Sequence, residues 1–136
     1  MGGELGMDAT EARNARVLVI DDDDDLRELV VRVVKQAGYA VDSASDGQAG
    51  LDRLAEQTYD VIVCDLRMPR MDGVTFYREV ERRDPVAVRR VVLMTAHLKT
   101  EEYMGFLGGV RAPVLNKPFT LDDFRAMVAR MVGPRR

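Results

Sequence analysis

Five short aliphatic stretches, separated by longer amphipathic ones, organise the chain. They cover residues 17–20, 39–44, 61–64, 91–94 and 113–116. Several are rich in β-branched residues, which favours strands over helices. Polar residues do not alternate regularly with the aliphatic ones, so both faces of the sheet should be covered, as in a parallel sheet between two helical layers.

Between these stretches, apolar residues recur at spacings of three and four, which is typical of helices with one buried face. The expected helices cover residues 24–37, 46–57, 74–83 and 100–107, with a last one between Thr120 and Gly133. Asp24 or Asp25 is expected to cap the first helix, and Ala55 to face inward from the second. The alternation of five strands with five helices predicts a doubly wound α/β domain.

The composition fits one such domain and argues against other classes of protein. The chain has 136 residues, 46% of them hydrophobic, and its net charge of −3 gives no basic excess for nucleic-acid binding. Its aliphatic runs are far shorter than the ~20 residues of a membrane span. The one cysteine, Cys64, cannot form an internal disulfide, which is consistent with a cytoplasmic location. We expect tails at residues 1–14 and 134–136 around a domain at 15–133.

Polar side chains follow four of the five expected strands, at the point where each strand ends. In chain order they are Asp21 with Asp22, then Asp65, then Thr95 with Ala96, and finally Lys117. The carboxyl ends of parallel strands share one edge of a sheet, which is where such folds bind ligands. We therefore expect these residues to converge on one site.

The chemistry of this set is specific. Three crowded carboxylates repel one another, and Mg²⁺ removes the conflict because it prefers carboxylate and phosphate oxygens as ligands. A carboxylate can also attack phosphorus and form an aspartyl phosphate. Phosphoryl transfer needs mainly position and positive charge, which Lys117 would supply, while the Thr95 hydroxyl and the Ala96 N–H could bind further phosphoryl oxygens.

These residues stand in motifs that a known family carries in the same order. The motifs cover residues 19–22, 63–69, 71–73, 94–96 and 116–119. Through them the chain, from about residue 16 to 132, resembles the receiver domain of two-component response regulators. The resemblance implies a flavodoxin-like fold with five parallel strands in the order 2-1-3-4-5.

The resemblance also implies a separate role for each of the acidic residues. Asp65 would be the phosphoacceptor. Asp22, Asp65 and the backbone carbonyl of Arg67 would bind Mg²⁺ directly, and Asp21 would bind it mainly through a water molecule. The metal-dependent transfer would come from a histidine kinase or a histidine phosphotransfer protein.

Other positions would bind and regulate the phosphoryl group by the same resemblance. Thr95 and Lys117 would hold its oxygens, with a cis bond between Lys117 and Pro118, while Arg67 and His97 would flank the path of attacking water. The family often has Tyr or Phe where this chain has Val114. The aromatic half of the switch between Thr95 and that position is therefore absent or rebuilt.

Output is expected through a docking surface formed by the helix at 100–107, the strand at 113–116 and the last helix. Its partner is an unknown protein or a second copy of the chain, with no direct contact to nucleic acid or membrane. The segment at 112–119 resembles receivers attached to hybrid histidine kinases. The chain would act alone or as a module of a longer protein.

Two other interpretations stay open. A degenerate receiver would only bind partners and would never be phosphorylated, and Val114 leaves room for it. A Mg²⁺-dependent phosphohydrolase could also use an aspartate nucleophile. The haloacid-dehalogenase kind places a second acid two residues after the nucleophile, where this chain has Arg67.

Overall fold

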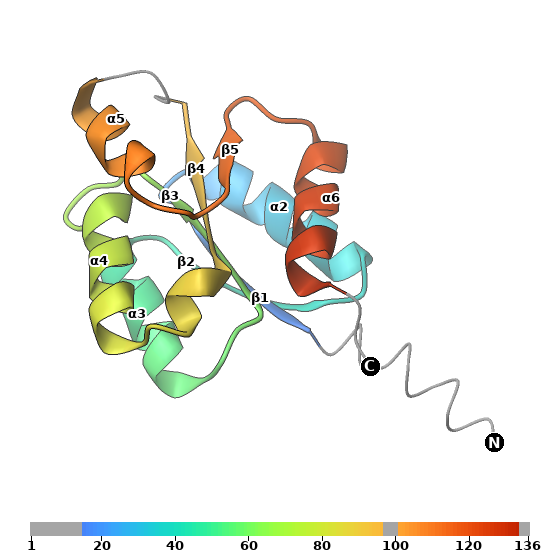
Figure 1. Ribbon diagram of the computed structural model, residues 1–136. Coiled ribbons are helices and arrows are strands. Elements are labelled where there is room, and N and C mark those ends of the chain that lie inside the picture. The colour runs from blue at the N-terminus through green and yellow to red at the C-terminus, as the bar shows by residue number, and fades with distance from the viewer. Residues whose placement is uncertain (1–14, 97–100, 134–136) are drawn as a thin grey trace.

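The computed structural model describes residues 15–96 and 101–133, which fold around one parallel sheet (Figure 1). Its strands are β1 (Arg16–Ile20), β2 (Ala40–Ala44), β3 (Val61–Asp65), β4 (Val91–Thr95) and β5 (Val114–Asn116). They lie in the order β2-β1-β3-β4-β5, and every neighbouring pair is parallel. The flavodoxin-like fold and its strand order are confirmed.

Helices cover both faces of this sheet. They are α2 (Asp24–Gln36), α3 (Gly47–Glu56), α4 (Gly73–Arg83), α5 (Glu101–Gly108) and α6 (Leu121–Val132), with a short 3₁₀ helix η1 (Ala87–Arg90) that was not expected. Figure 1 shows α3, α4 and α5 on one side of the sheet and α2 with α6 on the other. None of the helices described is long and apolar enough to cross a membrane.

The strands are aliphatic throughout because successive side chains enter different cores. Leu18 and Ile20 of β1 pack in the cluster that contains Phe76 of α4, whereas Val17 and Val19 pack in the cluster that contains Phe124 of α6. β1, β3 and β4 bury nearly all of their residues in this way. The central strands are therefore held firmly, and their carboxyl ends have fixed positions.

Two local expectations were wrong. The cap of α2 is Asp23, whose carboxylate accepts a hydrogen bond of 3.1 Å from the Leu26 N–H, so Asp24 and Asp25 lie within the first turn instead. Ala55 is exposed, because α3 buries Gly47, Gly50 and Leu51 and so presents a neighbouring face to the core. The Thr120 hydroxyl caps α6 by accepting from the Asp123 N–H at 2.9 Å.

The loop between β3 and α4 is fitted closely to the sheet. A Cβ atom on Gly73 would lie 2.5 Å from the Asp65 carbonyl oxygen, so only glycine allows this approach. The Gly73 N–H donates to the Leu66 carbonyl at 2.7 Å. Arg70 adopts φ 67°, an unusual conformation for a residue with a side chain. The backbone of this loop is therefore fixed in one conformation next to Asp65.

Candidate functional site

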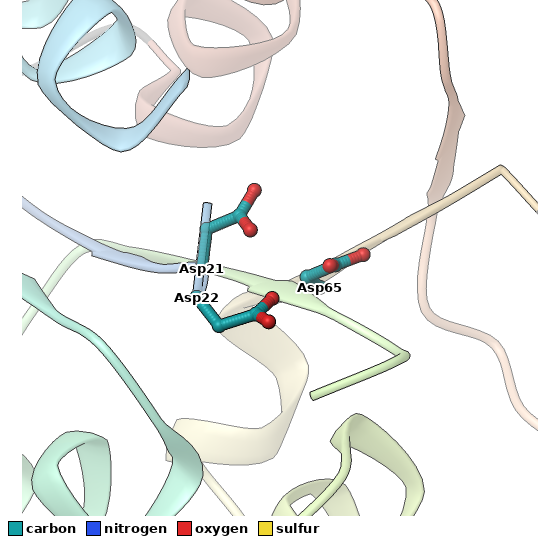
Figure 2. Close-up of side chains that lie close together, drawn as sticks. All are labelled: Asp21, Asp22 and Asp65. Carbon is teal, nitrogen blue, oxygen red and sulfur yellow. The ribbon is translucent and has the colours of Figure 1, made fainter. Parts of the chain in front are cut away.

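Three carboxylates meet where β1 and β3 end (Figure 2). β1 and β3 are neighbours, and Ile20 pairs with Cys64, so Asp21 and Asp65 follow side by side. Asp21, Asp22 and Asp65 each offer an oxygen, and these oxygens all lie within 4.8 Å of one another. The convergence expected from the strand ends is therefore present.

Asp21 is held in place from several sides. Its side chain is buried, and its own N–H donates to the Ala44 carbonyl at 3.1 Å. One carboxylate oxygen accepts from the Asp23 N–H at 3.0 Å, and the other accepts from the Lys117 ammonium at 3.0 Å. Asp22, by contrast, is exposed at the mouth of the site. The pair thus offers one fixed acid and one that is open to solvent.

Lys117 follows β5, the edge strand of the sheet, and reaches the acids at the ends of β1 and β3. Its ammonium nitrogen lies 3.0 Å from an Asp21 oxygen and 3.3 Å from an Asp65 oxygen. Its backbone N–H donates to the Thr95 carbonyl at 2.8 Å, and its peptide bond to Pro118 is cis, as the resemblance implied. Burial lowers the pKa of Lys117, but the charges of Asp65 and Asp21 outweigh this and raise it. The lysine is therefore a stable positive charge.

The surroundings of Asp65 disfavour its negative charge. Burial, followed by the charge of Asp21, raises its pKa to about 6, although Lys117 opposes the shift. One ammonium group therefore does not neutralise the three acids. A site that is short of positive charge and rich in carboxylate oxygens suits a hard divalent cation such as Mg²⁺. The residues present thus fit the metal that the sequence predicted.

The remaining predicted site residues lie in and around strands β4 and β5. Thr95 is buried at the end of β4 and pairs in register with Asn116, next to Lys117, and Ala96 follows it on the surface. Val114 lies on β5 and is 37% exposed. His97 and both predicted tails lie outside the described residues.

Sequence reasoning missed the partners of Arg67. Its guanidinium pairs with the Glu102 carboxylate of α5 at 2.5 Å, and it lies over the Tyr103 ring, 5.7 Å from the centroid. Arg67 and Glu102 are 35 positions apart, and no single motif contains both of them. No signal in the sequence could have indicated this contact.

Comparison with known families identifies the domain. The model of the response regulator receiver domain matches residues 17–129. The chain belongs to this family. As a receiver domain it is a phosphoacceptor signalling module of two-component systems, and members of the family work with histidine kinases. The resemblance seen in the sequence is confirmed.

Individual relatives agree with this membership. The chain is 33% identical over 117 residues to the DNA-binding transcriptional regulator NtrC of Escherichia coli, covering 86% of this chain and 24% of that protein. It thus spans about a quarter of the length of that relative.

Solved structures show the same fold. The response regulator TrrA of Thermotoga maritima, in complex with Mg²⁺ and BeF, is 27% identical with a TM-score of 0.74, covering 86% of this chain and 98% of that one. The receiver domain of sensor histidine kinase PA1611 from Pseudomonas aeruginosa, with a magnesium ion in its active-site cleft, is 24% identical with a TM-score of 0.78, covering 88% and 98%. The second likeness shows the fold alone, so membership of the hybrid kinase type stays a prediction.

Proposed function

We propose that this receiver domain accepts a phosphoryl group on Asp65 in a Mg²⁺-dependent reaction and thereby switches a protein-docking surface. The observation that carries the proposal is the position of the Asp65 carboxylate. It lies beside two further acids, and one of its oxygens is 3.3 Å from the Lys117 ammonium. This arrangement offers a nucleophile, oxygen ligands for a cation and a positive charge within one small site.

In the proposed reaction, an Asp65 carboxylate oxygen attacks the phosphorus of a phosphohistidine on the donor protein. A P–O bond forms as the P–N bond breaks, and the histidine ring leaves with the electron pair. Lys117 would bind one oxygen of the transferred group, and the Thr95 hydroxyl and Ala96 N–H would bind others. Positioning and charge are the main needs of this chemistry, and the residues at the sheet edge supply both.

Mg²⁺ would be held by Asp22, Asp65 and the backbone carbonyl of Arg67, with Asp21 acting through water. When bound, the cation would neutralise negative charge on the acids and on the phosphoryl oxygens. Asp21 would also keep Lys117 oriented, because its buried oxygen accepts the 3.0 Å bond from the ammonium. Hydrolysis of the aspartyl phosphate would reset the domain, with Arg67 and His97 tuning its rate.

The output surface that we propose consists of α5, β5 and α6. Met104 of α5 and Val114 of β5 are apolar and exposed on it, so it offers contacts to a partner protein or to a second copy of the chain. Phosphorylation would shift the balance between two conformations of this surface. The donor would be a histidine kinase or histidine phosphotransfer protein in the cytoplasm, and neither nucleic acid nor membrane would be contacted directly.

A phosphorylation assay tests the proposal. The protein is incubated with acetyl phosphate and Mg²⁺, and its intact mass is measured in acid, where aspartyl phosphates persist. We expect the mass of one phosphate to be added to the wild type and to Asp52→Asn, a matched change on the exposed face of α3. Asp65→Asn should gain nothing, and the added mass should disappear in mild base.

This assay, together with binding and turnover measurements, separates the two alternatives. A degenerate receiver would remain unphosphorylated in the wild type and would bind neither Mg²⁺ nor beryllofluoride. A phosphohydrolase would release inorganic phosphate from small phosphomonoesters over many turnovers. Phosphorylation that persists in Asp65→Asn would assign the reaction to another residue.

A further inference from the structure

Arg67 joins the loop that follows Asp65 to the first turn of α5. Its guanidinium lies 2.5 Å from a Glu102 oxygen, and its central carbon lies 5.7 Å from the centroid of the Tyr103 ring. The side chains of Arg67 and Glu102 are 53% and 51% exposed. Ion pairs as exposed as this one are weak, so an anion that forms nearby can compete with Glu102 for the guanidinium.

α5 has few other attachments. It is eight residues long, and Tyr103 is the residue that it buries fully. A Cβ atom added to Gly105 or Gly108 would meet no atom within 4 Å, so these positions pack against nothing. The Phe106 ring contacts the Tyr77 ring edge-on, with the ring centroids 5.4 Å apart, and anchors the second half of the helix. The first turn of α5 is therefore held to the rest of the domain mainly by the contacts of Arg67 with Glu102 and Tyr103.

Arg67 also links α5 to the phosphoryl site. It follows Asp65 by two residues, and its guanidinium contacts Glu102 and the Tyr103 ring in the first turn of α5. A change of charge on Asp65 therefore occurs beside the residue that holds this turn.

We propose that the Arg67 guanidinium exchanges between Glu102 and the phosphoryl group on Asp65, so that Glu102 limits phosphoryl binding and α5 responds to it. The proposal rests on the phosphoacceptor function of Asp65. A phosphoryl group brings more negative charge than one carboxylate and three strong acceptor oxygens, which a guanidinium binds in pairs. When the Arg67 guanidinium binds the phosphoryl group, the first turn of α5 loses the ion pair between Arg67 and Glu102. Arg67 and Glu102 would be positioning residues, not nucleophiles.

Beryllofluoride, which stands in for the phosphoryl group, gives the first test. Its dissociation constant in the presence of Mg²⁺ is measured for Glu102→Gln and for Glu101→Gln, which removes the same charge from the neighbouring position of α5. We expect Glu102→Gln to bind about threefold more tightly than Glu101→Gln, as expected for removal of a weak competing ion pair. In an Arg67→Gln background the difference should vanish.

Hydrogen exchange gives the second test, with a readout that a purely local role would not change. Beryllofluoride should speed exchange of the amides at residues 105–108 in the wild type, because these N–H groups bond to the carbonyls of the first turn of α5. In Arg67→Gln exchange there should already be fast and should not respond. Equal affinities of the Glu101 and Glu102 variants, or an unresponsive α5 in the wild type, would overturn this inference alone. A wild type that binds no beryllofluoride would overturn the phosphoacceptor function and this inference with it.

Discussion

The ammonium nitrogen of Lys117 lies 3.0 Å from a carboxylate oxygen of Asp21, although 96 positions separate the two residues. The contact joins the end of β1 to the end of β5, across the two strands between them. The sheet order brings the cation to the acids, and the bond to Asp21 orients it toward Asp65. The site is therefore a product of topology as much as of its residues.

Replacing Lys117 with Met should slow phosphorylation of Asp65 by about a hundredfold, the usual effect of removing one group that stabilises developing negative charge. The change should also raise the pKa of Asp65 further, because Lys117 now opposes the effects of burial and of Asp21. Lys35→Met, on the exposed surface of α2, is the control and should phosphorylate at the wild-type rate. Equal rates for both variants would remove Lys117 from the reaction.

The raised pKa of Asp65 predicts that Mg²⁺ binding depends on pH. A proton competes with the cation for the carboxylate, and the pKa of about 6 places this competition between pH 5 and pH 7. Binding measured calorimetrically should be about tenfold weaker at pH 5 than at pH 7. For a carboxyl with an ordinary pKa near ~4, the change would be small.

The same shift has a consequence for stability without metal. Because the folded chain holds this proton more tightly than the unfolded chain, the contribution of Asp65 to stability is present below about pH 4 and is lost as the pH rises through about 6. Asp65→Asn should remove this part of the dependence when the free energy of unfolding is measured in denaturant across that range. An unchanged slope would mean that Asp65 titrates normally.

Gly73→Ala and Gly105→Ala should change stability in opposite directions. The added methyl group on Gly73 would lie 2.5 Å from a backbone oxygen, so we expect a loss of about 3 kcal/mol in the free energy of unfolding. At Gly105 the methyl group meets open space within a helix, so we expect a gain of about 0.7 kcal/mol. Denaturant unfolding of both variants tests the pair, and a destabilised Gly105→Ala would contradict it.

Asp23→Ala should destabilise the domain by about 1 kcal/mol, because its carboxylate accepts the Leu26 N–H at the start of α2. Asp25→Ala removes the same charge two residues further on without removing the cap, so its effect should stay within a few tenths of a kcal/mol. Thermal unfolding of the two variants distinguishes them. A larger loss for Asp25→Ala would return the cap to the position expected from the sequence.

The sequence predicted the five strands, their polar ends and the helix boundaries to within a few residues, because each depends on local composition and spacing. It placed the α2 cap wrongly because any of three consecutive aspartates could accept the same N–H groups. It placed Ala55 inward although this residue is exposed, since periodicity alone does not decide which of two adjacent apolar positions faces the sheet.

The contacts of Arg67 could not be predicted for a different reason. The partners of a long, exposed side chain depend on how α5 lies against the β3–α4 loop, and that depends on packing far along the chain. The acidic site itself was predictable because its residues end buried strands, whose relative positions the sheet fixes. The site of chemistry can thus be predicted from the residues that end the strands, while its link to α5 cannot, because it depends on how α5 packs.

A crystal structure with Mg²⁺ and beryllofluoride tests the central claim most directly. The account predicts beryllium bonded to an Asp65 oxygen, a fluoride within hydrogen-bonding distance of the Lys117 ammonium, and the cation in contact with both Asp22 and Asp65. Beryllofluoride bound at another residue, or a Lys117 side chain turned away from Asp65, would contradict it.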